Sequence, residues 1–178
     1  MKTYIALLRG INVSGQKKVP MVELRDLLSK LGLENVQTYI QSGNVVFQSS
    51  EESKNKLEDI IQKAIANYFG FEVPILVKTS KEIQNILDHC PFSEAKKENS
   101  YFTLLHSIPK IELIDSTSKV NYPNETFHIT ETCVYFYSSM GYGKAKCNNN
   151  FFERKLKVTA TTRNYKTMIK LLSLCAEN

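Results

Sequence analysis

Glycines and cations gather in one short stretch near the N-terminus, in a pattern typical of anion-binding loops. Arg9, Gly10, Gly15 and Lys17 lie between a predicted strand and a predicted helix. Glycine lets backbone N–H groups approach a ligand closely, and such loops suit phosphates. The spacing of the two glycines matches a Walker A loop, but Gln16 stands where that motif has lysine. The stretch therefore predicts an anion site of another kind, and the alternative is a flexible connection with solvated lysines.

A second polar stretch is predicted at the same end of the sheet as this loop. Two predicted strands are joined by a tight hairpin at Ser42 and Gly43. In the order β-α-β-β-α-β, the loop after the first strand and the hairpin between the second and third lie at one end. The side chains that we expect to converge there are those of Arg9, Asn12, Gln41, Ser42 and Asn44.

Two further segments carry polar or basic residues that suit an anion. Thr162, Arg163 and Asn164 come just before the last predicted helix, where free N–H groups and hydroxyls form an anion site. The alternative is that Thr161 or Thr162 serves only as the helix N-cap. Residues 141–146 form a basic stretch after the last predicted strand, and this is either a ligand loop or a solvated turn.

No pattern in the chain predicts a metal, a cofactor or a catalytic pair. The three histidines and four cysteines show no ligand spacing, so we expect no metal and no cofactor. No local signature supports a Cys-His nucleophile, although the residue types alone leave one open. The carboxylates fall on predicted helix faces that look solvated, and no acid and base stand out. The sequence therefore leaves open whether the protein is an enzyme.

The periodicity of apolar residues predicts the strands and helices that carry these side chains. The first half of the chain reads as strand, helix, strand, strand, helix and strand, which is the ferredoxin-like order. The strand at residues 3–9 is apolar on both faces, which is typical of a strand covered on both sides. Pro74 in the fourth strand, residues 73–78, suggests an edge position. Thr79 and Glu82 have the spacing of a capping box that begins the next helix.

The second half repeats the order β-α-β-β-α, without the final strand. We expect an α+β fold of two ferredoxin-like (α-β plait) sandwiches packed together, with antiparallel sheets and helices. The predicted domains are residues 1–78, a βαββαβ unit, and residues 79–178, a second plait-like unit with C-terminal helices.

The composition of the chain restricts the cellular location and the binding partners that we expect for the protein. The net charge is +5, which suits an anionic ligand but falls short of a dedicated nucleic-acid binder. No export signal or membrane-length apolar segment occurs, so a cytoplasmic protein with free thiols is expected. We expect a small anionic ligand as partner, no membrane, and a monomer or weak homodimer. The third strand lacks the aromatic pattern of RNA-recognition modules, which argues against nucleic acid.

Four stretches of the chain match a family pattern, namely residues 7–13 and 39–47 and the closing stretches 151–156 and 160–164. In these stretches the chain resembles the bacterial family called domain of unknown function 1697. The resemblance implies two α-β plait domains and a cytoplasmic bacterial protein, and it implies no activity and no catalytic residues. The positions that depart from the family pattern are Ser14, where glycine is common, Ala145, where serine is common, and Tyr165, where tryptophan is common.

The leading hypothesis is a site for a small anionic ligand, phosphorylated or nucleotide-like, at the loop end of the first sheet. Arg9 and Lys17 would neutralise charge, and the backbone around Gly10 and Gly15 would bind oxygens. The side chains that would orient the ligand are Asn12, Gln41 and Asn44, and Arg163 would close the site. The alternative is a scaffold protein that associates with itself through a sheet edge, and nucleic-acid binding is the third hypothesis.

Overall fold

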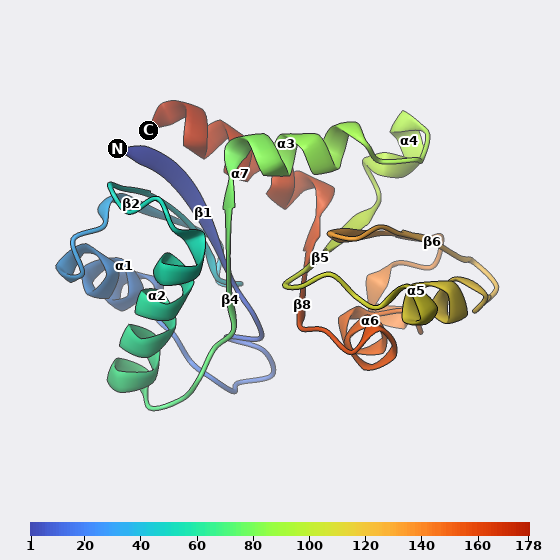
Figure 1. Ribbon diagram of the computed structural model, residues 1–178, viewed down its shortest axis with the longest axis horizontal. Helices are drawn as coiled ribbons and strands as arrows, with labels where there is room; N and C mark the ends of the chain where they lie inside the picture. The colour runs from blue at the N-terminus through green and yellow to red at the C-terminus, as the bar shows by residue number, and fades with distance from the viewer. The chain divides into compact units, whose positions relative to one another are not determined.

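Two four-stranded antiparallel sheets, each combined with helices, make up the computed structural model, which describes residues 1–178 (Figure 1). The chain divides into two compact units. The first comprises Met1–Asn85 together with Ile169–Asn178, and the second comprises Ile86–Met168. The α+β class with two sheet-helix units is therefore confirmed. The predicted domain boundary between residues 78 and 79 stays a prediction.

The first unit has the predicted β-α-β-β-α-β order. Its elements are β1 (Lys2–Leu8), α1 (Met21–Lys30), β2 (Glu34–Tyr39), β3 (Asn44–Ser49), α2 (Lys54–Phe69) and β4 (Ile75–Thr79). The strands lie in the order β2-β3-β1-β4, and every neighbouring pair is antiparallel. Strand β4 is an edge strand, as the proline at residue 74 predicted.

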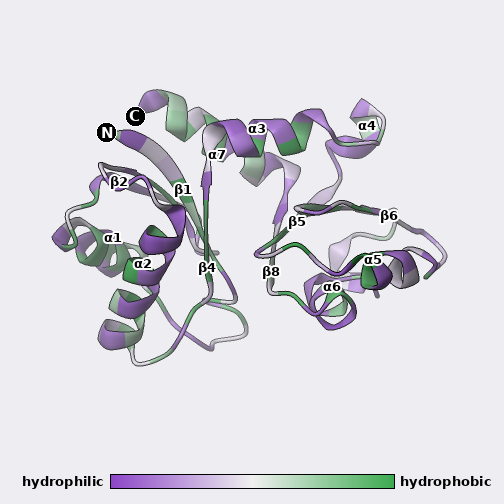
Figure 2. Ribbon diagram, in the orientation of Figure 1, coloured by the Kyte–Doolittle hydropathy of each residue, from purple (hydrophilic) through white to green (hydrophobic).

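Helices α1 and α2 cover one face of the first sheet. Their buried residues, such as Leu24 and Ile61, pack with Tyr4, Ala6 and Leu8 of β1 in one apolar cluster. Hydrophilic and hydrophobic residues both occur along these helices in Figure 2, as expected for helices with a single buried face. The residues of β1 from Tyr4 to Leu8 are at most 2% exposed, so both faces of this strand are buried as predicted.

The C-terminal end of the chain belongs to the first unit. The last residue, Asn178, accepts hydrogen bonds from the side-chain amides of Gln37 on β2 and Gln48 on β3, at 2.6 and 2.7 Å. It also donates to the Asn35 carbonyl at 3.2 Å. These contacts hold the C-terminal residue against the first sheet, although the two lie more than a hundred residues apart in the sequence.

The second unit repeats the same strand order. Its elements are α4 (Glu94–Lys97), β5 (Tyr101–Leu105), α5 (Ile111–Ser118), β6 (Glu125–Ile129), β7 (Cys133–Ser138), the 3-10 helix η1 (Tyr142–Lys144), α6 (Asn149–Leu156) and β8 (Ala160–Asn164). The sheet order β6-β7-β5-β8 corresponds, strand by strand, to the order of the first sheet. The two helices that extend across the division between units are α3 (Ser80–Asp88) and α7 (Tyr165–Glu177).

The final strand β8 corrects the expectation that the second plait lacks one. The polar side chains of this segment favoured a helix boundary in the sequence. They form a strand because their partners satisfy them: the hydroxyls of Thr103 and Thr162 share a hydrogen bond of 2.8 Å across the β5–β8 pair. Thr162 also donates to the Asn149 side chain of α6 at 2.8 Å. A buried polar group that is hydrogen-bonded is compatible with a sheet interior.

The apolar core of the second unit lies between its sheet and helices α5 and α6. Phe152 and Leu156 of α6 and the partly buried Leu113 of α5 pack with Val134 and Phe136 of β7. The rings of Phe136 and Phe152 meet edge to face at 6.3 Å. Because this core holds α5 and α6 in place, it also positions the loops at the ends of these two helices.

The predicted capping box at the start of α3 is confirmed. The Thr79 hydroxyl accepts from the Glu82 N–H at 3.2 Å, and the Glu82 carboxylate accepts from the Thr79 N–H at 2.8 Å. Partial burial acts to raise the pKa of Glu82, but hydrogen bonds from Lys54 and Thr79 and the charge of Lys78 outweigh it. The pKa therefore lies below its ordinary value of 4.5.

Glu82→Gln is expected to lower the free energy of unfolding near neutral pH by at most about 1 kcal/mol, as is typical of partly exposed ion pairs. Because folding lowers the pKa of Glu82, its contribution is complete above 4.5 and is lost as the pH falls through the folded value. Denaturant unfolding at neutral and acidic pH measures this, and the difference between the proteins should close in acid. Glu34→Gln, at an exposed carboxylate without an ion pair, is the control. A difference that persists in acid would contradict the assignment.

Candidate functional site

Asn12 joins the two loops that the sequence predicted to meet at one end of the first sheet. Its side-chain amide donates to the carbonyls of Gln41 and Val19 at 2.8 and 3.0 Å, and its Oδ1 accepts from the Val19 N–H at 2.8 Å. Both amide hydrogens are therefore used within the chain. Asn12 holds the β1–α1 loop against the β2–β3 hairpin, and a direct contact between Asn12 and a ligand stays a prediction.

The tip of the β1–α1 loop is a small hairpin. The Gln16 N–H donates to the Val13 carbonyl at 2.9 Å, and the Asn12 N–H donates to the Lys17 carbonyl at 3.1 Å. Ser14 and Gly15 between them have φ values of 50° and 75°, as in a type I′ turn. This geometry differs from the phosphate-wrapping Walker A loop, in agreement with the mismatch at Gln16.

The cations of this loop occupy different environments. Lys17 is exposed and its ammonium group donates to the Glu72 carbonyl at 2.7 Å, which ties the loop to the α2–β4 connection. Lys18 is exposed. Arg9 is partly buried, and its backbone N–H donates to the Pro74 carbonyl at 2.9 Å. The loop end of the first unit, meaning residues 9–20 and 40–43, therefore carries three cations and no carboxylate.

The β2–β3 hairpin is longer than predicted, because the strands end at Tyr39 and begin again at Asn44. Asn44 is fully buried, and its amide donates to the Tyr39 carbonyl at 3.1 Å and to the Ser42 hydroxyl at 3.0 Å. These two hydrogen bonds close the hairpin, and a role for Asn44 in orienting a ligand stays a prediction. Gln41 and Ser42 are exposed at the turn.

The segment around Arg163 lies in β8 of the second unit. Asn164 is the N-cap of α7, because its side chain accepts from the Thr167 N–H at 2.9 Å. The expectation that Thr161 or Thr162 caps this helix is wrong, since the strand continues to Asn164. Arg163 is 8% exposed and donates to the Thr162 carbonyl at 2.9 Å. A role for Thr162, Arg163 and Asn164 in binding a ligand stays a prediction.

The basic stretch at residues 141–146 is built around Tyr142. Its ring stacks on Tyr101 at 4.5 Å, and its hydroxyl accepts from the Asn149 N–H at 2.8 Å. The backbone N–H of Lys146 donates to the Glu125 carboxylate at 2.8 Å. The stretch is therefore held to its own unit by structural contacts, beside a cavity of about 290 Å³.

The thiols and the metal-ligating residue types are arranged without a catalytic pattern. All four cysteines are free. Burial, together with Glu125, raises the pKa of the Cys147 thiol to about 12, and burial raises that of Cys175 to about 11. These thiols stay protonated near neutral pH, where a nucleophile must be a thiolate. No group of three or more His, Cys, Asp or Glu side chains is placed to hold a metal ion. No helix combines the length and apolar character that crossing a membrane requires.

A cavity of about 680 Å³ lies at the loop end of the second unit, and no pattern in the sequence predicts it. The β5–α5 loop, the first turn of α5 and the end of α6 line it, with Lys110 and Lys157 among the lining residues. No motif marks these lysines, which stand 47 positions apart in the chain. Only the folded unit brings them to one cavity.

The fold and these loops define a two-plait α+β protein with polar loop ends. The chain belongs to the family described as protein of unknown function DUF1697, whose model matches residues 1–135. A solved structure, the conserved bacterial protein SP0830 from Streptococcus pneumoniae, has 26% sequence identity and a TM-score of 0.77. The match covers 97% of this chain and 98% of that chain. A search of curated proteins finds no match. The predicted family is confirmed, and its description assigns no activity.

Proposed function

We propose that the protein binds a small anionic ligand, phosphorylated or nucleotide-like, at the loop end of the first unit. The observation that carries this proposal is the hydrogen bond from Asn12 to the Gln41 carbonyl. This bond joins the β1–α1 loop and the β2–β3 hairpin into one surface. Arg9, Lys17 and Lys18 supply positive charge to that surface, and neither loop contains a carboxylate. Preorganised cations and backbone donors are what an anion requires.

The backbone of these loops supports the proposal. Asn12, Ser14, Lys17 and Ile40 all have positive φ, between 45° and 53°, and a β-branched residue such as isoleucine is strained there. Such conformations cost about 1–3 kcal/mol each and gather at ligand sites, because the surrounding structure must hold them. The N–H groups of Gly10 and Gly15 make no hydrogen bond within the chain and remain donors for a ligand.

We propose a distinct role for each group of residues in this site. Lys17 and Lys18 meet the charge of the ligand, the N–H groups of the two glycines bind its oxygens, and Gln41 contacts its uncharged part. Asn12 and Asn44 hold the loops in place. No acid and base face each other in this arrangement, so binding is better supported than catalysis.

The double change Lys17→Ala with Lys18→Ala is expected to weaken the binding of ATP and inorganic pyrophosphate by about tenfold or more, because two charged hydrogen-bond donors are lost. Isothermal titration calorimetry measures the Kd at fixed salt. Lys30→Ala with Lys63→Ala removes the same charge from exposed positions on α1 and α2 and is the matched control.

Equal weakening in both double variants would mean that net charge, and no defined site, attracts the anions. Absence of binding by the unmodified chain would also overturn the proposal. Concentration-dependent association without any ligand effect would instead favour the scaffold hypothesis. A steep dependence of RNA binding on salt would favour the third hypothesis.

A further inference from the structure

The two units can be compared loop by loop, because equivalent hydrogen bonds mark equivalent positions. In the first unit the Leu8 N–H donates to the Gly43 carbonyl at 2.8 Å. In the second, the Leu105 N–H donates to the Thr132 carbonyl at 2.9 Å. The following residues, Arg9 and His106, donate in the same way to Pro74 and Thr159, each at 2.9 Å. The β1–α1 loop of the first unit therefore corresponds to the β5–α5 loop of the second.

These equivalent loops differ in length and in what they cover. The β1–α1 loop, residues 9–20, has twelve residues, whereas the β5–α5 loop, residues 106–110, has five. The longer loop buries Ile11 to 2% exposure and reaches the α2–β4 connection, where Lys17 bonds to Glu72. The shorter loop leaves the cavity of about 680 Å³ between itself and the α6–β8 connection. A volume of this size is typical of small-molecule sites.

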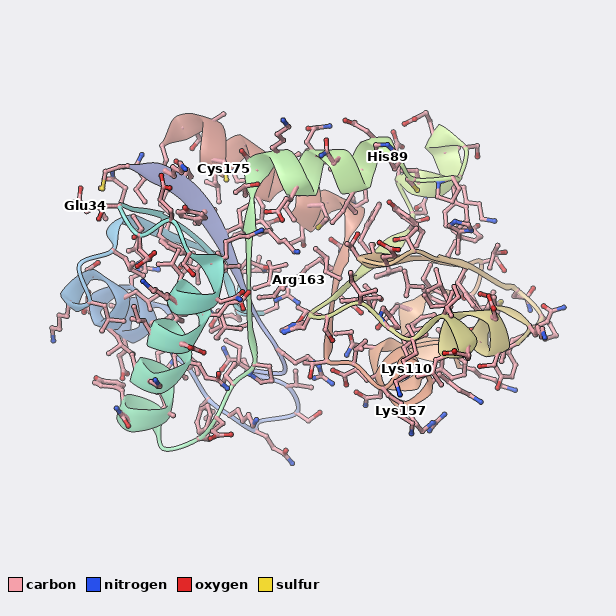
Figure 3. The ribbon with its side chains drawn as sticks, viewed as in Figure 1. Glu34, His89, Lys110, Lys157, Arg163 and Cys175 are labelled. Atoms are coloured by element: carbon pink, nitrogen blue, oxygen red, sulfur yellow. The ribbon has the colours of Figure 1, made fainter.

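The lining of the cavity combines two cations with an apolar wall. Lys110 of the β5–α5 loop and Lys157 at the end of α6 both line the cavity, and they lie near each other in Figure 3. Neither ammonium group makes a hydrogen bond or an ion pair within the chain, and Glu112 is the one carboxylate of the lining. The rest of the wall is apolar apart from Ser107, and its apolar members are Ile108, Pro109, Leu113, Leu156 and Val158.

Two features of this lining are unfavourable for the free energy of the chain when no ligand is bound. Ile108 is 65% exposed at the rim of the cavity. Lys157 occupies the left-handed C-cap position of α6 with φ 58°, whereas the C-cap of α2 in the first unit is Gly70 with φ 81°. Glycine is the residue that this position favours. A lysine therefore stands at a site where backbone conformation alone prefers no side chain.

We propose that this cavity binds a small amphiphilic anion, in which an acyl or aryl body carries a carboxylate or a phosphate. The ammonium groups of Lys110 and Lys157 meet the anionic head, and Ile108, Leu113 and Val158 cover the apolar body. The charge of the lining is net positive by one, from two lysines and one glutamate, so an anionic head matches it. This proposal is independent of the anion site proposed for the first unit.

The test uses octanoate and octyl phosphate as probes and the Lys157→Gly variant of the full chain. Glycine removes the cation but suits the left-handed backbone, so the denaturation midpoint should stay equal or rise. The Kd for octanoate, measured by calorimetry or by NMR titration, should rise about tenfold. Lys155→Ala, an exposed lysine on the same helix outside the cavity, should leave the Kd unchanged. Ile108→Ser should weaken octanoate binding as well.

Several results would overturn the proposal. One is absence of octanoate and octyl phosphate binding at millimolar concentration. Another is an unchanged Kd in Lys157→Gly, and a third is binding of neutral octanol as tight as that of octanoate. The double variant at Lys17 and Lys18 separates the two sites. If it weakens octanoate binding as much as Lys157→Gly does, the location proposed here is wrong.

Discussion

Gly43→Ala is expected to lower the free energy of unfolding by about 3 kcal/mol. A Cβ atom at this position would lie 2.5 Å from the Cβ of Leu8 and 3.1 Å from the Cδ1 of Ile11. Both neighbours are buried, and Leu8 belongs to the central strand β1. Overpacking a core costs about 1–3 kcal/mol, and the left-handed φ of 79° adds about 1–2 kcal/mol for a residue with a Cβ.

Gly32→Ala is the matched control for this prediction. Gly32 has a φ of 83° but no atom within 4 Å of the added Cβ, so only the backbone cost remains. Chemical denaturation of the three proteins measures both effects. The difference between the two variants isolates the close approach of the hairpin to β1. Equal destabilisation would show that the hairpin moves away without cost.

Asn12→Asp is expected to lower the free energy of unfolding by about 2 kcal/mol near neutral pH. The change keeps the shape of the side chain, but it replaces the amide that donates to Val19 and Gln41 with an oxygen. A carboxylate then faces two carbonyl groups, and the fully buried Val19 loses a hydrogen-bond partner for its carbonyl. In acid the protonated aspartate can donate to one of these carbonyls, so the loss should become smaller.

Asn124→Asp controls for charge and for the backbone. Asn124 also has a positive φ, 68°, but its exposed side chain makes no hydrogen bond. Its variant should differ from the unmodified chain by less than about 0.5 kcal/mol, as is usual for surface changes. Denaturant unfolding at neutral and acidic pH provides the measurement. A similar loss in both variants would contradict the role of Asn12 in joining the two loops.

Apolar periodicity and the residues that end helices and strands were sufficient to predict most of the first unit. Apolar spacing predicted its strands and helices, and strand directions then predicted that the β1–α1 loop meets the β2–β3 hairpin. Both follow from local patterns and from a common topology, so no knowledge of distant contacts is needed. The capping box at Thr79 and Glu82 was visible for the same reason, since its partners lie three residues apart.

Strand β8 shows where local pattern was insufficient. Its residues are mostly polar, and in isolation they favour a cap or a turn. They form a strand because β5 offers a free edge and because the Thr103 hydroxyl and the Asn149 amide satisfy Thr162. The partners lie 59 and 13 positions away along the chain. Such compensation is invisible until the sheet is assembled.

The same distinction holds for the β1–α1 loop and the β2–β3 hairpin. Residue types and their order were sufficient to predict that glycines, cations and amides gather at one end of a plait. The folded structure sets the partners of the amides, because Asn12 donates to the Gln41 carbonyl of the neighbouring hairpin, whereas Asn44 donates to Tyr39 and Ser42 within its own hairpin. It also decided that the second unit keeps a cavity, since that depends on the reach of a loop and on lysines far apart in sequence. Hydrogen-bond partners and loop reach are properties of the folded chain, whereas residue type and order are properties of the sequence.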